Sequence, residues 1–311
     1  MSDSVLAGVD IGGTKILGVT VHPDRPAVVL DEHRVPTPSG AEAVLDAIAG
    51  VVKELAGHRP VSAVGVGIAG LVNRDGVLRM GPNLPNLRAV SVRDELGTRL
   101  DLPVTVDNDA TCAAWAEYRA GAARGFADSL CVSLGTGIGA GYVAGGEVER
   151  GAHGFAGEAG HMLIDPNGPV CPCGRRGCWE RMASGSGLGR MAREAAEAGR
   201  LARPLALAGG EVAALKGEHV AAAATEGDDA ALVLLRSFAW WVAAGIGSLV
   251  TVLDPAIVVV GGGLIEMGEP LLAPVRDHYR DLVMAYKERQ DVAIVAAELG
   301  ERAAAIGAAL L

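Results

Sequence analysis

Three cysteines and one histidine share a short segment rich in glycine and proline. They are His161, Cys171, Cys173 and Cys178. Three thiolate sulfurs and one imidazole nitrogen suit tetrahedral Zn²⁺, and the glycines at 174 and 177 let the chain turn tightly enough to gather the sulfurs. The alternative is a loop that carries three reduced thiols. The clustering on glycine turns favours zinc, and a shell supplied entirely by the protein predicts a structural ion rather than a catalytic one.

Glycine turns follow three apolar, strand-like segments. They are Asp10-Ile11-Gly12-Gly13-Thr14-Lys15, Leu134-Gly135-Thr136-Gly137 and Gly261-Gly262-Gly263. Turns without side chains expose backbone N–H groups that bind phosphate oxygens. In the first turn Thr14 adds a hydroxyl and Lys15 a positive charge, and Asp10 is placed to hold a hydrated Mg²⁺ ion. The spacing is not that of a Walker A loop, and a plain hairpin turn explains either of the first two alone. Three such turns together favour a phosphate site.

A pair of acidic residues flanks an asparagine where a short strand passes into a helix. The segment is Asp107-Asn108-Asp109, after the strand-like residues 103–106. A carboxylate at a helix N-terminus is stabilised by the helix dipole, so on position alone the simplest interpretation is capping by Asn108 or Asp109. The alternative is a general base held at the start of the helix.

The elements that must position these residues alternate between strands and helices. Strands are predicted at 5–11, 15–21, 27–35, 61–68, 103–106, 129–135, 140–148 and 256–263. Helices are predicted from the apolar face that runs from Val44 to Leu55 and over residues 109–123. A hairpin interrupted by glycine occurs twice, after residues 11 and 134, which suggests two similar lobes around a cleft. The fold class predicted for each lobe is α/β.

The charge and composition of the chain limit the classes of binding partner and the cellular compartment that we expect. The chain has 311 residues and a net charge of −10, which disfavours non-specific binding to nucleic acid or to an anionic membrane. The N-terminus shows no secretory signal, so we expect a cytoplasmic protein with reduced cysteines. Cys112 and Cys131, in apolar surroundings, are expected to be buried packing residues. The apolar run from Ser237 to Leu253 is expected to be a buried helix rather than a membrane span.

The glycine turns and the cysteine segment resemble one known family. The turns look like the phosphate and adenosine loops of the superfamily of sugar kinases, actin and heat-shock chaperone ATPases. Within that superfamily the chain resembles the ROK family, whose pattern is G-x-x-G-E-x-G-H followed by C-x-C-G-x-x-G-C-x-E. Among ROK proteins the chain most resembles the bacterial glucokinases. The matching positions are Gly154, Gly157, Glu158, Gly160, His161, Cys171, Cys173, Gly174, Gly177, Cys178 and Glu180.

The resemblance implies a fold of two actin-like (ribonuclease H-like) α/β lobes around a central cleft. The small N-terminal lobe would comprise residues 1–109 and about 297–311, with the last helix, about 301–311, folded back onto it. The large lobe would comprise 110–296 and carry the zinc segment 161–178. A homodimer or homotetramer is also implied.

The resemblance further implies ATP-dependent phosphorylation of glucose to glucose 6-phosphate. Asp109 would be the general base and Mg²⁺ would accompany ATP, while the zinc ion would be structural. His161 would bind zinc through one ring nitrogen and a sugar hydroxyl through the other. The residues implied to bind the sugar are Gly70, Asn83, Asn108, Asp109, Glu158, His161 and Glu180. Those implied to bind the nucleotide are Asp10, Gly12, Gly13, Thr14, Lys15, Thr136, Gly137, Gly262 and Gly263.

Two positions depart from the family, and several functions stay open. Asp107 stands where glutamate is common, a change expected to be neutral, and Leu87 stands near a position that is often aromatic. Related kinases of N-acetylmannosamine, N-acetylglucosamine or fructose share the same motifs. A polyphosphate donor is disfavoured by the adenosine-type glycine turn. A sugar-responsive DNA-binding regulator is disfavoured because only nine residues precede Asp10, and a filament or chaperone ATPase would have no use for the zinc segment.

Overall fold

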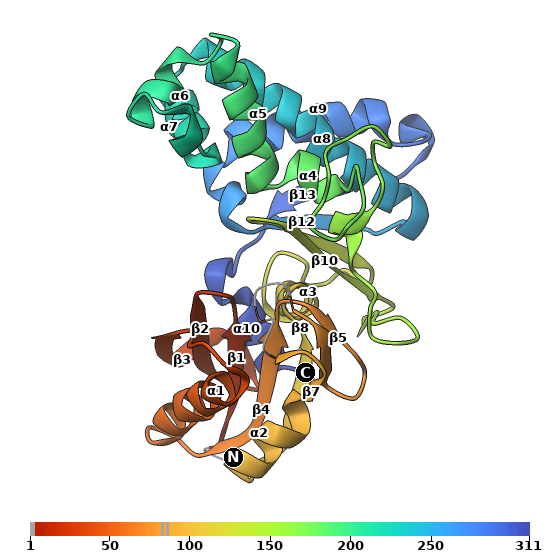
Figure 1. Ribbon diagram of the computed structural model, residues 1–311. Coiled ribbons are helices and arrows are strands. Elements are labelled where there is room, and N and C mark those ends of the chain that lie inside the picture. The colour runs from red at the N-terminus through yellow and green to blue at the C-terminus, as the bar shows by residue number, and fades with distance from the viewer. Residues whose placement is uncertain (1–3, 82–83, 85–86) are drawn as a thin grey trace. The chain divides into compact units, whose positions relative to one another are not determined.

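The computed structural model describes residues 4–81, 84 and 87–311. Its backbone divides into two compact units (Figure 1). The first contains the described residues up to 131 together with 140–157 and 297–311, and the second contains 132–139 and 158–296. Segments 110–131 and 140–157, which the sequence boundaries would assign to the large lobe, thus belong to the first unit. Helices and strands are mixed throughout, so the predicted α/β class is confirmed.

The first unit is built on a five-stranded sheet of order β3-β2-β1-β4-β8. The strands are β1 (Val5–Ile11), β2 (Lys15–His22), β3 (Arg25–Pro36), β4 (Val61–Ile68) and β8 (Val104–Asn108). Strands β1, β2 and β3 pair antiparallel, as two hairpins require, whereas β4 and β8 run parallel to β1. The carboxyl ends of β1, β4 and β8 therefore meet at one edge of the sheet.

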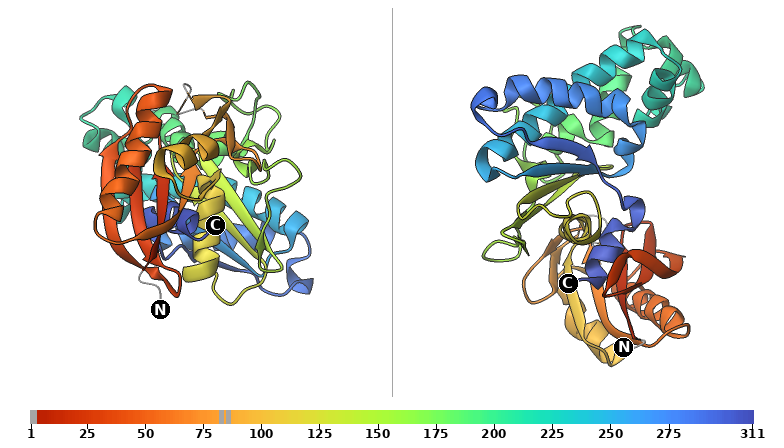
Figure 2. Two further views of the ribbon diagram at one scale, coloured as in Figure 1. Left: turned by 90° about the horizontal axis from the view of Figure 1, so that it is seen from below. Right: turned by 180° about the vertical axis from the view of Figure 1, so that it is seen from behind.

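Helices cover both faces of this sheet (Figure 2). Alternate residues of β1 and β2 point to opposite faces. On one face Val9 and Ile11 pack against α1 (Ala41–Ala56). On the other, Leu17 and Val19 of β2 pack with Ala305 and Ile306 of α10 (Ala303–Ala309), which also contacts α3 (Asp109–Ala120). The last helix thus completes the core of the unit that contains the N-terminal strands.

A small sheet and one helix of the first unit were not predicted from the sequence. Strands β5 (Leu71–Val72), β6 (Val77–Met80) and β7 (Val90–Ser91) form an antiparallel sheet, followed by α2 (Val92–Leu100). The strands have two to four residues, and α2 buries only Val92 and Leu96. Such short elements leave no apolar period long enough to detect.

The second five-stranded sheet has the order β11-β10-β9-β12-β13. Its strands are β9 (Ser129–Leu134), β10 (Ile138–Ala144), β11 (Glu147–Val148), β12 (Ile257–Gly261) and β13 (Ala293–Ala296). The helices of the second unit are α4 (Trp179–Ala183), α5 (Gly185–Glu197), α6 (Ala202–Leu207), α7 (Gly217–Thr225), α8 (Asp229–Leu253) and α9 (Glu269–Leu282). Short 3₁₀ helices are η2 (Ala159–His161), η3 (Val212–Ala214), η4 (Gly263–Met267), η5 (Tyr286–Glu288) and, in the first unit, η6 (Gly300–Arg302).

Helix α8 is long and apolar enough to cross a membrane by length and composition. Half of its most apolar window is nevertheless buried inside the protein, where the helix packs against α4, α7 and α9. Phe238 and Val242 on this buried side are fully covered. The helix therefore fits the core helix expected from the sequence.

Candidate active site

The first group of predicted site residues lies where three parallel strands of the first sheet end. Asp10 of β1 pairs with Gly67 of β4, which pairs with Asp107 of β8. These residues stand at one level and point to one face of the sheet. A Cβ atom on Gly67 would lie 3.6 Å from the Asp109 Cα and 3.3 Å from the Cys112 Sγ. The lack of a side chain at 67 therefore lets the start of α3 approach the face that carries both aspartates.

Asn108 caps helix α3, and Asp109 is the first residue of that helix. The Asn108 Oδ1 accepts the N–H groups of Ala110 at 2.8 Å and Thr111 at 3.1 Å, which satisfies two of the free donors at the helix start. Its Nδ2 donates to the Gly70 carbonyl at 3.1 Å. The Asp109 Oδ1 accepts the Ala110 N–H at 2.9 Å. The capping interpretation thus holds for Asn108, and Asp109, which is half-buried, is available for chemistry.

The two carboxyl groups at this strand end carry raised pKa values. Burial, with a smaller contribution from the negative charge of Asp109, raises the pKa of Asp10 to about 7, and Lys15 opposes the shift. Burial also raises the pKa of Asp109, which the N–H group of Ala110 partly offsets. A carboxylate whose pKa is moved toward neutrality is a better proton acceptor than one at its ordinary value. The electrostatics therefore suit Asp109 for a role as general base.

The pKa of the buried Cys112 thiol is affected by several charged side chains near the end of strand β8 and the start of helix α3. Burial raises the pKa of the Cys112 thiol well above its ordinary value, and the negative charges of Asp107, Asp109 and Asp10 raise it further. The guanidinium of Arg150 acts in the opposite direction. Three carboxylates and one guanidinium therefore lie close enough to influence a single buried thiol.

The first glycine turn joins β1 and β2 in the same unit. The Gly12 N–H donates to the Lys15 carbonyl at 3.0 Å and closes the turn. Gly13 and Thr14, between them, are exposed at its tip. The Lys15 Nζ lies 2.7 Å from Glu301 Oε2, a partner that the sequence did not suggest. The tip can thus present its groups to an anion, and the cation beside it is held by a carboxylate.

The second glycine turn, in the second unit, lies beside one predicted sugar ligand. A Cβ atom on Gly137 would lie 2.6 Å from Glu180 Oε2. The Thr136 carbonyl accepts the Ser186 hydroxyl at 2.8 Å, so the turn is tied to the start of α5. Thr136 and Gly137, predicted for the nucleotide, and Glu180, predicted for the sugar, are therefore neighbours.

The third glycine turn packs against the end of β9. Gly262 has a φ of 82°, and a Cβ atom there would lie 2.5 Å from the Leu134 carbonyl oxygen. Only glycine fits both the left-handed conformation and this close approach. Gly263 follows at the start of η4. The second and third glycine turns, predicted to bind one nucleotide, thus lie side by side.

The four predicted metal ligands come together in the second unit. The ligand atoms of His161, Cys171, Cys173 and Cys178 all lie within 4.8 Å of one another. The Cys171 Sγ is 3.8 Å from the His161 Nδ1, and the Cys173 Sγ is 3.6 Å from the Cys178 Sγ. Tetrahedral zinc, with bonds of about 2.3 Å to sulfur and about 2.0 Å to nitrogen, separates its ligand atoms by about 3.5 to 3.8 Å. The donor set and its spacing therefore fit Zn²⁺.

Two glutamates predicted to bind the sugar lie beside this cluster. The His161 Nε2 is 3.9 Å from Glu158 Oε2, and its Nδ1 is 3.8 Å from Glu180 Oε1. With Nδ1 among the sulfurs, Nε2 is left for another partner, which fits the double role expected for His161. The segment is anchored at its end by the fully buried Trp179, whose Nε1 donates to the Trp241 carbonyl at 2.8 Å.

Some functional residues were placed differently or missed. Asn83 lies outside the described residues. Leu87, discussed above as a departure from an aromatic position, is only 1% exposed and belongs to the core of the first unit. Glu301 was not predicted from the sequence; hydrogen bonds from Lys15 and Arg34 lower the pKa of its carboxyl group to about 2. The partner of Asp107 was also missed: it is Arg150, 43 positions away. Neither pairing has a local sequence signal.

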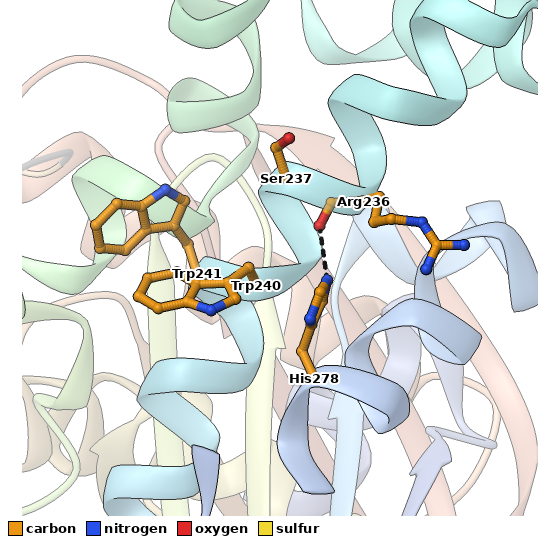
Figure 3. Close-up of a pocket in the computed structure, with 5 residues that line it drawn as sticks. All are labelled: Arg236, Ser237, Trp240, Trp241 and His278. Carbon is orange, nitrogen blue, oxygen red and sulfur yellow. Dashed lines mark hydrogen bonds between the residues drawn. The ribbon is translucent and has the colours of Figure 1, made fainter. Parts of the chain in front are cut away.

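A pocket in the second unit lies between helices α8 and α9. Figure 3 shows its lining, which consists of Arg236, Ser237, Trp240, Trp241 and His278. The His278 Nε2 is 3.2 Å from the Arg236 carbonyl oxygen, and the two indole rings meet edge to face. None of these five residues is one that the sequence predicted to bind sugar, nucleotide or metal.

Comparison with known proteins gives matches along nearly the whole chain. The model of the ROK family matches residues 6–311. The chain is 40% identical over 305 residues to the glucokinase of Streptomyces coelicolor, covering 97% of this chain and 95% of that protein. It is 34% identical over 306 residues to the N-acetylmannosamine kinase of Escherichia coli O157:H7, covering 97% and 96%. The solved structure of a ROK family glucokinase from Streptomyces griseus, in complex with glucose and AMPPNP, superposes with a TM-score of 0.88 at 39% identity, covering 98% of each chain.

Proposed function

Because the chain belongs to the ROK family and is an ATP-dependent hexose kinase, we propose that its acceptor is glucose and its product glucose 6-phosphate. The observation that carries the proposed chemistry is the position of Asp109, half-buried at the start of α3 on the sheet face that carries Asp10. The acceptor is supported by the identity to a glucokinase over almost the whole chain.

In the proposed reaction Asp109 is the general base. The oxygen of the sugar hydroxyl attacks the γ-phosphorus of ATP, the bond from that phosphorus to the bridging oxygen breaks, and ADP leaves. The hydroxyl proton passes to the Asp109 carboxylate. A positioned base contributes about 10²- to 10⁴-fold to such a rate, and most of the remaining acceleration comes from alignment and charge neutralisation.

The nucleotide is proposed to bind through the three glycine turns. Backbone N–H groups at Gly12, Gly13 and Thr14, with the Lys15 ammonium, would accept one part of the phosphate chain. The remaining contacts are assigned to Thr136 and Gly137 of the second turn and to the glycines of the third. Asp10 would hold Mg²⁺ through its carboxylate, since oxygen ligands suit that ion. When bound, the ion neutralises phosphate charge.

The sugar is proposed to bind through the groups that the resemblance to the family implies. Glu158, His161 and Glu180 would contact hydroxyl groups, as would Asn108, the Gly70 backbone and Asn83. Zinc, held by His161 and the three cysteines, would fix the direction of the imidazole so that its second nitrogen can donate to a hydroxyl. Buried groups that each need a hydroxyl partner would discriminate against sugars that lack one.

A second candidate acceptor is N-acetylmannosamine. It is favoured by the 34% identity to an N-acetylmannosamine kinase over nearly the whole chain, and the matched motifs do not separate the two substrates. The deciding experiment measures formation of the sugar phosphate from glucose, fructose, N-acetylmannosamine and N-acetylglucosamine, using ATP and then polyphosphate as donor. We expect the highest kcat/KM with glucose and ATP. A higher value for an N-acetylhexosamine would replace the acceptor, and no turnover with any hexose would refute the proposed function.

A further inference from the structure

We propose that Asp107 and Arg150 form a positioning pair, which holds the general base Asp109 in place and neutralises the carboxylate nearest to it in the chain. The inference rests on the proposed function, because it assigns Asp109 its catalytic role. It concerns Asp107, which the sequence presented as a neutral departure from glutamate, and Arg150, for which no role was predicted from the sequence.

Both oxygens of the Asp107 carboxylate are engaged. Its Oδ1 accepts the N–H of Asn108 at 2.8 Å, and its Oδ2 accepts the Arg150 Nε–H at 2.5 Å. The Asp107 side chain is only 7% exposed and that of Arg150 is 33% exposed. A charge-assisted bond in such surroundings is stronger and more directional than a neutral one on the surface. The pair therefore fixes the peptide bond that leads into Asn108 and, one residue later, Asp109.

The loop that carries Arg150 is itself held in place within the first unit. The Gly151 carbonyl accepts two bonds from the Arg74 guanidinium, at 2.9 and 2.6 Å. A Cβ atom on Gly154, which has a φ of 88°, would lie 2.8 Å from the Val72 carbonyl oxygen. Arg150 thus reaches Asp107 from a loop with two further attachments, and it acts as a fixed anchor rather than a mobile surface cation.

The pair also sets the charge at the strand end. Among the described residues, the charges that act on the buried Cys112 thiol of α3 are those of Asp109 itself, Asp10 of β1, Asp107 of β8 and the Arg150 guanidinium. The charges of Asp109 and of Lys15 of β2 act on Asp10. Strand β4 contributes only Gly67 at this level. Without Arg150, Asp107 would be a second uncompensated carboxylate beside the general base, and a nearby like charge disfavours ionisation of Asp109.

Removing each partner should therefore move the pH dependence of kcat in opposite directions. At low pH kcat should fall as Asp109 becomes protonated, and we call this part of the kcat profile its acid limb. In Arg150→Met the unpaired Asp107 carboxylate should raise the pKa of Asp109 and so shift the acid limb to higher pH. In Asp107→Asn the remaining guanidinium should shift it to lower pH. The double variant, which removes both charges, should return the limb close to its wild-type position.

Loss of positioning should appear in kcat rather than in KM. For Arg150→Met we expect kcat to fall about 10- to 100-fold, because a small misplacement of a catalytic group has effects of that size. The KM for glucose should change by less than about threefold, since the interaction lost is needed in the transition state rather than for binding. Arg150→Lys keeps the charge without the planar donor, so it should leave the acid limb in place and recover part of kcat.

Arg74→Met is the matched control, because it releases the same loop at Gly151 without removing the partner of Asp107. It should leave the acid limb unmoved. Circular dichroism spectra show which variants are folded, and if Asp107→Asn is not, the three Arg150 and Arg74 single variants still decide the question.

Opposite shifts in the two single variants, with recovery in the double variant, support the pair. Shifts in the same direction, no shift, or an unchanged kcat in Arg150→Met overturn it. An equal shift in Arg74→Met also overturns it, because the effect would then come from the loop alone. A wild-type protein that phosphorylates no hexose is a separate result: it refutes the proposed function, and this inference with it, before any variant is made.

Discussion

Replacing Asp10 with asparagine should stabilise the protein at high pH and leave it unable to phosphorylate sugar. The pKa of Asp10 is raised from 3.8 to about 7, chiefly by burial, so its ionised form is disfavoured in the folded protein. The folded state therefore binds more protons than the unfolded state between these two values, and stability falls as the pH rises through that range. Asparagine, which cannot ionise, removes this loss.

The size of the effect follows from the two pKa values. A difference between 3.8 and about 7, at about 1.4 kcal/mol per pH unit, sets an upper limit of about 4 kcal/mol at pH 8. Part of that cost is already present at pH 5, where an unfolded aspartate is ionised. The stability of Asp10→Asn relative to the wild type should therefore increase by about 2 to 3 kcal/mol between pH 5 and pH 8.

The assay is urea unfolding at the two pH values, without Mg²⁺ and with the zinc site intact. Far-UV circular dichroism follows both units, and Trp115 is the one tryptophan in the first unit. Asp46→Asn is the control for losing one negative charge, because the Asp46 side chain is 73% exposed and its ion pair with Arg99, at 3.3 Å, should contribute at most about 1 kcal/mol at such an exposed position. An advantage of Asp10→Asn that stays constant or shrinks as the pH rises would refute the electrostatic account of this strand end.

Three further predictions concern the base, the metal and the nucleotide. Asp109→Asn should bind glucose with nearly unchanged affinity in calorimetry and lose about 10²- to 10⁴-fold in kcat; more than about a tenth of wild-type turnover would contradict the assignment. Metal analysis should find about one zinc ion per chain. Cys173→Ser should lose the zinc and weaken glucose binding. A protein that is purified without zinc, and whose affinity for glucose is unchanged by chelators, would exclude the structural role. Gly262→Ala should lower the free energy of unfolding by about 1 to 3 kcal/mol and raise the KM for ATP, because a Cβ atom would meet the Leu134 carbonyl oxygen at 2.5 Å; unchanged values of both would show that the turn tolerates a side chain.

Local patterns predicted several of the larger elements of the fold, whereas helices α5, α7 and α9 of the second unit were not predicted. Strand β1 has the predicted bounds of 5–11, and β4 those of 61–68, because each is a β-branched run that ends at a turn signal. The helix predicted from the apolar face between Val44 and Leu55 is α1. The small sheet of β5, β6 and β7 was missed because its strands are too short for a period of two to show.

The metal cluster could be predicted because its ligands are chemically distinctive and close in sequence. Within eighteen positions the chain has few ways to place three sulfurs and one imidazole. The capping of α3 by Asn108 was likewise one of the two alternatives that the sequence left open. In both cases the interaction is local, so residue type and spacing carry most of the information.

Contacts between distant segments could not be predicted. Arg150 reaches Asp107 across 43 positions, and Lys15 reaches Glu301 across 286. Arginine and glutamate are common on protein surfaces, so neither residue type marks a partner. The register that brings Asp10 level with Asp107 also depends on strand β4 lying between β1 and β8, which is a property of the sheet and not of either segment.

The most direct test of the proposed mechanism is a crystal structure of the protein with glucose, Mg²⁺ and a non-hydrolysable ATP analogue. The Asp109 carboxylate should lie about 2.6 to 3.2 Å from the glucose 6-hydroxyl oxygen, the distance required for proton transfer. A complex in which that hydroxyl faces another base, with the Asp109 carboxylate out of hydrogen-bonding reach, would contradict it.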